Sequence, residues 1–393
     1  MQTLFWTSLF IIVYTFIGYG LIITLLVKLK TKTKVKEVYD LPKITFLVAA
    51  YNEEDIIEDK IQNCLQLDYP EDSVQFAFVT DGSTDGTMNA IEKHKQFKLY
   101  HSAERKGKIA AVNRVMKLID TPITVFSDAN VMINQEGLKN LIQRFTSENI
   151  GAVSGEKIIV SNEYDGASAS GEGFYWKYES YLKRKDAEWN TLVGSAGEFF
   201  GVRTELYENV QQDTLIEDFI ITMNLASKGF KVDYAPNALA IESGSLNIKE
   251  ETKRKVRISA GGIQAVIRLK HLLNPFKYGR LTFQYVSHRA IRWTLMPLAL
   301  IAALITNFII IEEAFFYQLT FTCQVMFYLL AALGFILRNK KTKIKMVYIP
   351  YYFTYMHYCV ILGWLKFFRG KQAVTWEKSK RADNVTATTN SVA

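Results

Sequence analysis

Long apolar segments lie toward both ends of this 393-residue chain, and the region between them is much more polar. Leu4 to Val27 is apolar and long enough to span a bilayer, because about 20 helical residues suffice. It lacks the leading charge and the small-residue cleavage site of a signal peptide, so we expect it to remain in the protein. The sequence therefore predicts membrane helices combined with a separate water-exposed domain.

Lysines directly after this first segment predict how the chain is oriented. By the positive-inside rule, they place the following region in the cytoplasm. Two further spans, Ile291 to Ile311 and Phe315 to Leu337, would form an out-and-back hairpin that turns at Glu312 and Glu313. We therefore expect a multi-pass protein of the cell inner (plasma) membrane with a cytoplasmic middle region. The orienting lysines are Lys28, Lys30, Lys32, Lys34 and Lys36.

The last apolar stretch, Val347 to Phe368, fits two interpretations. It is rich in tyrosine and is followed by basic residues, which a full span would place outside the cell. A third span against the positive-inside rule and a tilted, interfacial or re-entrant helix therefore both stay open. The net charge of +8 comes largely from basic clusters beside such segments, so it indicates contact with membrane lipids and no nucleic acid partner.

Strand and helix patterns alternate in the middle region from about Lys43 onward. Runs of β-branched and aromatic residues predict strands, and amphipathic stretches predict helices between them. This alternation is typical of an α/β fold with a mostly parallel sheet, in which ligands gather at the carboxyl ends of the strands. The expected strands are Ile44 to Ala49, Val74 to Thr80, Phe97 to His101 and Ile123 to Ser127, and the expected helices are Asp55 to Leu67, Thr84 to Lys95 and Lys108 to Ile119.

Acidic residues follow three of these strands, where a dinucleotide-binding fold would carry glycines. The segments are Ala50 to Glu54, Asp81 to Gly86 and Asp128 to Asn130. No G-x-G-x-x-G follows the first strand and the sequence has no P-loop motif, which disfavours a nicotinamide cofactor and a P-loop site. Asp128 could hold a hard cation against a phosphate, and Lys108 at a helix start supplies donors for phosphate.

Each of these motifs alone also fits an ordinary structural role. Asp81 to Gly86 has the composition of a turn with an N-cap, and Asn52 to Glu54 has that of a helix cap. A short pair such as Asp128 and Asn130 is common in loops. The three motifs together, each directly after a predicted strand, indicate a nucleotide diphosphate site with a metal ion.

The order and spacing of the motifs resemble those of the membrane-bound inverting glycosyltransferases of family 2, which include cellulose, chitin, hyaluronan and poly-N-acetylglucosamine synthases. Thr80 to Ser83 resembles the family's nucleotide-reading Asp-Gly-Ser, and Asp128 to Asn130 resembles its metal-binding Asp-x-Asp. Ile216 to Phe219 is similar to its Thr-Glu-Asp motif, whose Asp is the catalytic base. Further matching segments are Val48 to Glu54, Lys106 to Asn113 and, on the acceptor side, Gly194 to Arg203.

The resemblance implies a GT-A fold, an α/β domain with a Rossmann-like, mostly parallel sheet. It implies transfer of a sugar from a nucleotide sugar, a UDP-hexose or UDP-N-acetylhexosamine, to an acceptor hydroxyl in cell-surface polysaccharide or glycan synthesis. Asp218 would be the catalytic base beside Glu217, and Asp128 and Asn130 would bind Mg²⁺ or Mn²⁺. The donor would be bound by Ala50, Tyr51, Glu53, Asp81, Lys108, Asp128 and Arg257.

Five regions are expected along the chain. Lys249 to Leu273 mixes basic and apolar residues, as a helix in the headgroup layer does, with an interruption at Gly261 and Gly262. The regions are an N-terminal transmembrane helix (1–30), the GT-A domain (40–245), amphipathic interfacial helices (246–290), C-terminal transmembrane helices (291–368) and a basic, polar tail (369–393).

Three positions depart from the family pattern. Asn130 stands where the metal motif usually ends in Asp, and Ile216 replaces the Thr of Thr-Glu-Asp. Arg254 to Ile258 stands where processive synthases carry Gln-x-x-Arg-Trp, and only Arg257 matches. Without that Trp, processive synthesis and single addition both stay open.

Two rival functions are compatible with the same residues. A polyprenyl-phosphate glycosyltransferase would use a lipid phosphate, which is already ionised and needs no base such as Asp218. A transporter that merely binds nucleotide is disfavoured, because the predicted spans carry almost no ionisable residue at mid-depth apart from His357. The expected partners are a nucleotide-sugar donor, a glycan or lipid-linked acceptor and membrane lipids, with a homo-oligomer or an export partner left open.

Overall fold

The computed structural model describes residues 1–31, 41–160, 168–244, 247–338 and 344–370. It divides into two compact units. The sheet unit consists chiefly of Thr31–Val160 and Asp186–Glu251, and the helical unit consists of Met1–Lys30, Ser161–Lys185 and Thr252–Gln372. Every predicted site residue except Arg257 belongs to the sheet unit. The predicted orienting lysines from 32 to 36 and the tail from 371 onward lie outside the described residues.

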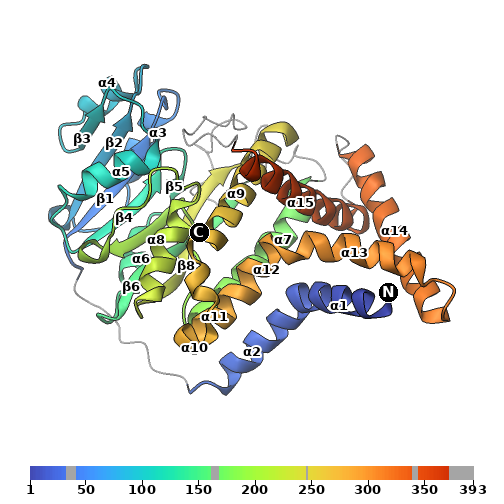
Figure 1. The fold of residues 1–393 in the computed structure, drawn as a ribbon. Helices are drawn as coiled ribbons and strands as arrows, with labels where there is room; N and C mark the ends of the chain where they lie inside the picture. Colours follow the sequence, from blue (N-terminus) through green and yellow to red (C-terminus); the bar gives the residue numbers. More distant parts are fainter. Residues whose placement is uncertain (32–40, 161–167, 245–246, 339–343, 371–393) are drawn as a thin grey trace. The chain divides into compact units, whose positions relative to one another are not determined.

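The sheet unit is built on eight strands in the order β3-β2-β1-β4-β7-β6-β8-β5 (Figure 1). Its first half is parallel, because β1 pairs with β2 and β4, and β2 pairs with β3. These are the strands that the sequence predicts, and the predicted helices between them are present but shorter. The elements are β1 (Ile44–Ala50), α3 (Ile57–Leu65), β2 (Val74–Asp81), α4 (Thr87–Glu92), β3 (Lys98–Ser102), α5 (Lys108–Met116) and β4 (Ile123–Asp128).

The other half of the sheet is mixed. β7 runs antiparallel to both β4 and β6, β6 and β8 are parallel, and the short β5 pairs antiparallel with β8. The predicted α/β fold is confirmed, and its parallel pairing prevails in the half that carries the acidic strand ends. The elements of the mixed half are β5 (Met132–Ile133), α6 (Gly137–Ile142), β6 (Ile150–Val160), β7 (Phe199–Arg203), α8 (Glu217–Ser227) and β8 (Lys231–Ser243).

Strand β1 is the buried centre of the parallel half. All of its residues, Ile44–Ala50, are buried, as expected of an apolar strand that has neighbours on both edges. It packs in one hydrophobic core with Phe78 of β2. In the register of the sheet, Ala49 is level with Val79 on β2 and with Asp128 on β4. The loops that follow these strands therefore begin at one edge of the sheet.

The helical unit contains two described helices that are long and apolar enough to cross a membrane, Gln2–Leu29 and Phe315–Leu337. Both coincide with predicted spans, and they make the chain a membrane protein. The first is α1 (Gln2–Val13) continued through a π-helical turn into α2 (Tyr19–Leu29), and the second is α14.

The segment expected to span from Ile291 to Ile311 is not one straight helix. Arg280–Trp293 and Leu295–Ile309, the latter being α13, meet at an angle of 58°. Pro297 in the first turn of α13 explains the bend, because proline lacks the N–H that would bond to the carbonyl of Trp293. That carbonyl instead accepts the indole N–H of Trp364 at 2.7 Å.

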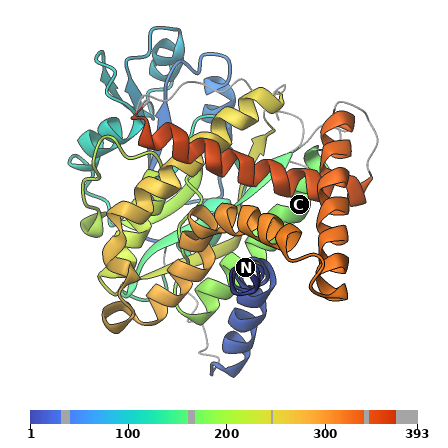
Figure 2. The same cartoon turned by 45° about the vertical axis from the view of Figure 1, so that its right-hand side comes forward.

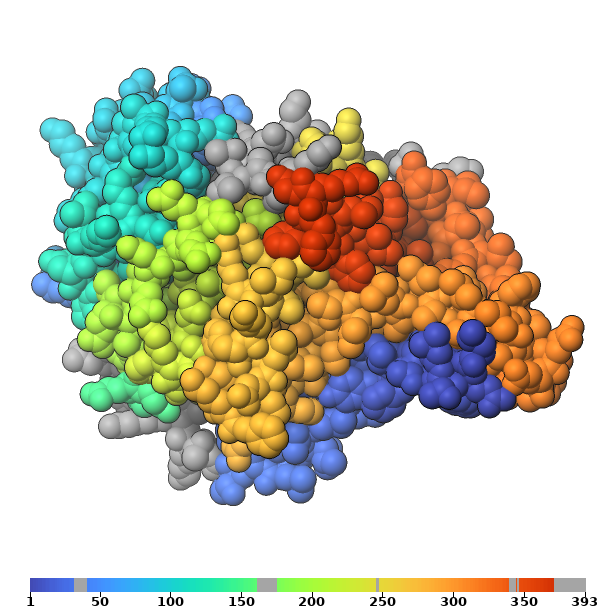
Figure 3. All heavy atoms as spheres, viewed as in Figure 1, coloured from blue at the N-terminus to red at the C-terminus, as the bar shows by residue number. Residues whose placement is uncertain are grey.

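The remaining helices pack around these spans. α1 lies against α13, as Figures 1 and 3 show, and α15 (Lys345–Phe368) lies against α14 (Figure 2). α15 contains Pro350 and is not one of the two described helices that pass the length and apolarity test, so both interpretations of this segment stay open. The other helices of this part are α7 (Ser168–Trp189), α9 (Ile248–Arg268), α10 (Pro275–Tyr278), α11 (Arg280–Tyr285) and α12 (Ile291–Trp293).

The predicted interruption of the amphipathic segment at Gly261 and Gly262 is wrong. α9 runs unbroken through both glycines from Ile248 to Arg268. A Cβ atom at Gly262 would lie only 2.5 Å from the indole ring of Trp293. The glycine therefore permits close packing of two helices, and the surrounding contacts override its weak helix propensity.

Candidate active site

One pocket collects most of the predicted donor-binding residues. Ala50, Tyr51, Asp81 and Lys108 all line it, at the carboxyl ends of β1 and β2 and at the start of α5. The guanidinium of Arg105, which also lines the pocket, lies 3.8 Å from the centre of the Tyr51 ring. Such a cation over an aromatic face is a stabilising contact. This contact holds Arg105 and Tyr51 together at one edge of the pocket.

Asp81 fixes the loop that closes this pocket. Its carboxylate accepts the backbone N–H of Lys106 at 3.0 Å and that of Gly107 at 2.6 Å. Gly107 has φ = +97°, in the left-handed region that favours glycine, and α5 begins at the next residue, Lys108. The amino terminus of a helix favours anions, so the loop directs α5 and Lys108 toward a phosphate-binding position.

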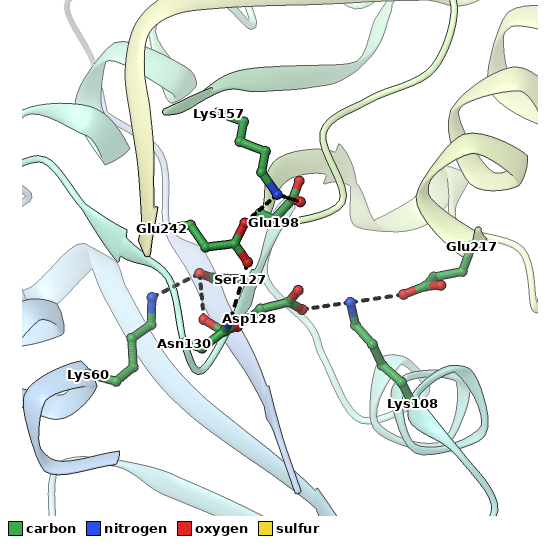
Figure 4. Close-up of polar contacts among 9 residues, drawn as sticks. All are labelled: Lys60, Lys108, Ser127, Asp128, Asn130, Lys157, Glu198, Glu217 and Glu242. Carbon is green, nitrogen blue, oxygen red and sulfur yellow. Dashed lines mark hydrogen bonds and ion pairs between the residues drawn. The ribbon is translucent and has the colours of Figure 1, made fainter. Parts of the chain in front are cut away.

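Lys108 lies between two carboxylates from distant parts of the sequence. Its Nζ is 2.7 Å from Asp128 Oδ1 and 2.9 Å from Glu217 Oε1 (Figure 4). Burial alone would lower the pKa of Lys108, but Asp128 and Glu217 raise it above its ordinary value, so the side chain stays cationic. Burial raises the pKa of Asp128, and Lys108 opposes that shift.

Asp218 lies at the start of α8, against the segment from Gly194 to Arg203 that resembles the acceptor side of the family. A Cβ atom at Gly197 would lie 3.0 Å from Asp218 Cγ, and one at Gly194 would lie 2.3 Å from the ring of Phe219. Gly194 also has φ = +85°. The Ser195 hydroxyl donates to the backbone carbonyl of Asp218 at 3.2 Å. This stretch therefore sets the position of the first turn of α8, and with it the Asp218 carboxyl.

The surroundings of Asp218 make it a stronger base than an ordinary aspartate. Burial, together with the negative charges of Glu217 and Glu198, raises its pKa to about 7, and Lys108 opposes this shift. Asp218 is nevertheless half-buried and keeps some exposed surface. A carboxylate with a pKa near the working pH can accept a proton from a hydroxyl in a reaction.

The predicted metal-binding residues, Asp128 and Asn130, fit a hard divalent cation. The Asn130 amide nitrogen donates to Glu242 Oε1 at 3.2 Å, whereas Asn130 Oδ1 is buried without a hydrogen-bond partner in the described structure. Magnesium and manganese prefer such oxygen ligands and keep several waters. Among the residues described, no group of three or more His, Cys, Asp or Glu side chains could hold a metal. Asp128 and Asn130 would thus supply part of the ligand set of a cation, and waters or a bound diphosphate would supply the rest.

Three predicted donor-binding residues do not line this pocket: Asp128, which contacts Lys108 beside it, Glu53 and Arg257. Glu53 is buried, and its main chain begins α3: its carbonyl accepts the N–H groups of Ile56 and Ile57, while its own N–H donates to Thr87 Oγ1 at 2.8 Å. Arg257 lies on α9 in the helical unit. Donor binding by Glu53 and Arg257 stays a prediction.

Several charged residues that surround the metal motif do not stand out in the sequence. Lys60 is fully buried and donates to Ser127 Oγ at 2.9 Å and to the Val131 carbonyl at 2.5 Å, on either side of the motif. Its spacing from Ile57 and Cys64 places Lys60 on the apolar stripe of α3. A lysine on such a stripe is the feature of the sequence that indicates a buried, functional side chain. The others are Lys157, Glu198 and Glu242, of which Glu198 alone belongs to a segment that resembles a family motif (Figure 4).

Part of the chain is similar to known sequences. Residues 45–211 match the family model Glycosyl transferase family 2. A poly-beta-1,6-N-acetyl-D-glucosamine synthase from Staphylococcus aureus (strain MSSA476) is 28% identical over 243 residues, which cover 58% of this chain and 57% of that protein. The synthase of the same name from Staphylococcus epidermidis is 26% identical over 239 residues, covering 57% of this chain and 56% of that protein. The chain thus spans little more than half the length of these relatives.

The fold also matches a solved structure. The mannosyltransferase PcManGT from Pyrobaculum calidifontis, in complex with GDP-Man and Mn²⁺, superimposes with a TM-score of 0.68 at 21% sequence identity. The match covers 94% of this chain and 100% of that one, so it includes helices outside the sheet. Residues 45–211 therefore match glycosyltransferase family 2, as the motifs predict, and the fold is similar to that of a solved GT-A enzyme.

Proposed function

We propose that the chain is an inverting membrane glycosyltransferase, which moves a sugar from a nucleotide sugar to an acceptor hydroxyl. The observation that supports this most is the row Asp128, Lys108 and Glu217, with the raised-pKa carboxyl of Asp218 next to Glu217. One end of the row offers a cation and oxygen ligands to a diphosphate. The other end offers a base to an acceptor.

The leaving diphosphate would be stabilised at the Lys108 end. Lys108 remains protonated and can donate to a phosphate oxygen from its present position beside Asp128. A Mg²⁺ or Mn²⁺ ion held by Asp128 and Asn130 would act as a Lewis acid on the diphosphate. Arg257 is proposed to share this role, as its match to the family motif implies. Together these groups offset the charge that the diphosphate gains.

Asp218 would remove the proton from the acceptor. The acceptor oxygen forms a bond to the anomeric carbon as the bond from that carbon to the diphosphate breaks, and the electron pair of that bond leaves with the diphosphate. The hydroxyl proton passes to Asp218. Because the single attack comes from the face opposite the leaving group, an α-linked donor gives a β-linked product. Glu217 keeps Asp218 basic through its neighbouring charge.

The proposed donor is a UDP-hexose or UDP-N-acetylhexosamine. Ala50, Tyr51 and Asp81 would bind its nucleoside, because they line one pocket beside Lys108. UDP-N-acetylglucosamine is the first donor to test, because the matching relatives are named as poly-β-1,6-N-acetyl-D-glucosamine synthases. GDP-mannose is the second, because it is bound in the structure of similar fold. The product would be a cell-surface polysaccharide or glycan.

The proposed location is the cell inner membrane, with several spans and the sheet unit in the cytoplasm, where nucleotide sugars occur. Lys28 and Lys30 at the end of the first span support this orientation. The acceptor would be a glycan or a lipid-linked sugar reached at the membrane surface. A homo-oligomer or a separate export partner would complete a polysaccharide pathway.

The test is donor-dependent release of nucleoside diphosphate by the full chain in purified membranes. UDP-N-acetylglucosamine, other UDP-sugars and GDP-mannose are compared with Mg²⁺, Mn²⁺ and EDTA. We expect one donor to be hydrolysed or transferred in a metal-dependent way, and Asp128→Ala and Asp218→Asn to abolish this. Asp72→Asn, at an exposed carboxylate on the same unit, is the matched control.

Two results would contradict the proposal. Release that persists in Asp128→Ala and Asp218→Asn would remove these residues from the reaction. Transfer by Asp218→Asn to a polyprenyl phosphate, but not to a sugar hydroxyl, would instead assign the chain to lipid-phosphate glycosylation, since that acceptor needs no base.

A further inference from the structure

A hydrogen bond from its nitrogen fixes the orientation of the Asn130 amide. Its Nδ2 donates to Glu242 Oε1 at 3.2 Å. A primary amide carries donors at one end and an acceptor at the other, so a partner at one end decides which end faces away. Here the nitrogen faces Glu242, and Oδ1 is the buried end for which the described residues provide no hydrogen-bond partner.

Glu242 is in turn fixed by Lys157. The two residues lie near each other on the paired strands β6 and β8, and their side chains are only 3% and 2% exposed. Lys157 forms ion pairs with both Glu242 and Glu198 (Figure 4). Turning Glu242 away from Asn130 would break a buried ion pair, which is costly in a low-dielectric interior. The acceptor for the Asn130 amide is therefore rigid.

We propose that Glu242, anchored by Lys157, is a positioning residue that makes Asn130 present its carbonyl oxygen to the divalent cation. The inference rests on the proposed function, in which that cation accompanies the donor diphosphate. A hard cation binds oxygen and does not bind an amide nitrogen. An asparagine in the metal motif therefore works only if something keeps its nitrogen turned away, and Glu242 does so.

An aspartate at position 130 would not need the hydrogen bond to Glu242. A carboxylate carries oxygen at both ends, so an aspartate at position 130 would offer a ligand in either orientation. It would also meet the negative charge of Glu242 across the present hydrogen bond, where like charges repel. Glu242 should therefore matter for asparagine at position 130 and be dispensable, or unfavourable, for aspartate.

The test is a double-mutant cycle on the full chain in detergent, read as Mn²⁺ binding in the presence of UDP. Loss of the free Mn²⁺ signal in electron paramagnetic resonance measures binding without catalysis. Glu242→Met removes the acceptor with little change in volume and should weaken Mn²⁺ binding about tenfold or more, because the amide can then flip. Glu242→Gln keeps an oxygen acceptor and should bind Mn²⁺ within about threefold of the native chain.

The decisive comparison is in the Asn130→Asp background. There, Glu242→Met should leave Mn²⁺ binding unchanged or improve it, so the two substitutions should be strongly non-additive. Glu148→Met, at an exposed glutamate on the same unit, is the control. A variant that fails to fold is recognised by its size-exclusion profile, and Glu242→Gln then still tests whether an oxygen acceptor is sufficient.

The outcomes separate this inference from the proposed function. Equal weakening by Glu242→Met with asparagine and with aspartate at position 130 would assign Glu242 a general structural or electrostatic role and overturn the inference alone. No Mn²⁺ binding by the native chain with UDP would overturn the proposed metal and the inference together.

Discussion

Lys108 Nζ lies 2.7 Å from Asp128 Oδ1, so the lysine at the start of α5 is already paired with the carboxylate of the metal motif. The same ammonium contacts Glu217, which precedes the expected base. The motif residues that would handle the diphosphate and the acceptor are thus joined through one side chain, although they lie far apart in the sequence.

Lys108→Met should lower kcat/KM for the nucleotide sugar at least about a hundredfold, which corresponds to about 2.7 kcal/mol. The substitution removes the donor to the diphosphate and leaves Asp128 and Glu217 to repel each other. Initial rates of nucleoside diphosphate release measure the effect. Lys93→Met, at an exposed lysine of the sheet unit, should retain native rates. Native activity of Lys108→Met would show that the ammonium group of Lys108 is not needed.

The rate should follow the protonation of Asp218. Its pKa is raised to about 7, chiefly by burial and by Glu217. Because the base must be deprotonated, kcat/KM should rise as pH increases toward 7 and level off above it. Rates measured from pH 5.5 to 8.5 at saturating metal test this. A profile that is flat across this range would contradict a base with this pKa.

Asp218→Asn should stabilise the fold at alkaline pH while abolishing transfer. The folded-state pKa lies above the ordinary value of an aspartate, so the native state binds more protons between about pH 4 and 7, and stability contributed by this group is lost as pH rises through that window. Asparagine cannot ionise and avoids this loss. The free energy of unfolding of Asp218→Asn should therefore exceed that of the native chain by roughly 1 kcal/mol or more at pH 8. The difference in melting temperature from the native chain should grow between pH 5 and pH 8. A pH-independent difference would contradict the prediction.

Gly197→Ala should reduce transfer much more than it reduces stability. The added methyl group would lie 3.0 Å from Asp218 Cγ, so the carboxyl must shift by a few tenths of an ångström. Small misplacements of a reacting group cost about tenfold or more in rate. We expect kcat to fall with little change in the KM for the donor, and the melting temperature to stay within a few degrees. Native kcat in Gly197→Ala would show that this contact does not position the Asp218 carboxyl.

The nucleotide side of the site could be predicted because it depends on local patterns. Apolar strand runs that end in Asp81 and Asp128 define which residues meet at the edge of a parallel sheet, and the structure places them there. The support around these residues could not be predicted. Glu242 reaches Asn130 only because β8 pairs with β6 and with the short β5, a mixed arrangement that no local periodicity specifies.

The shape of the membrane segments likewise depends on contacts that local sequence does not specify. Apolar length alone gives the two candidate spans, but the bend before α13 depends on where the carbonyl left open by Pro297 finds a donor. Likewise, Gly261 and Gly262 indicate a break by their propensity, whereas the packing of Gly262 against Trp293 keeps α9 continuous. Contacts between segments distant in sequence decide both outcomes.

The bend in the membrane region has a mechanical consequence. Trp293 contacts Gly262 of α9 through its ring and Trp364 of α15 through its carbonyl, and Gly363 packs with its Cβ position 2.6 Å from Ser259 of α9. The helices α9, α12 and α15 therefore contact one another at one place. A change in the tilt of α15 must therefore also move α9, the helix that carries Arg257, because Gly363 of α15 packs directly on Ser259 of α9.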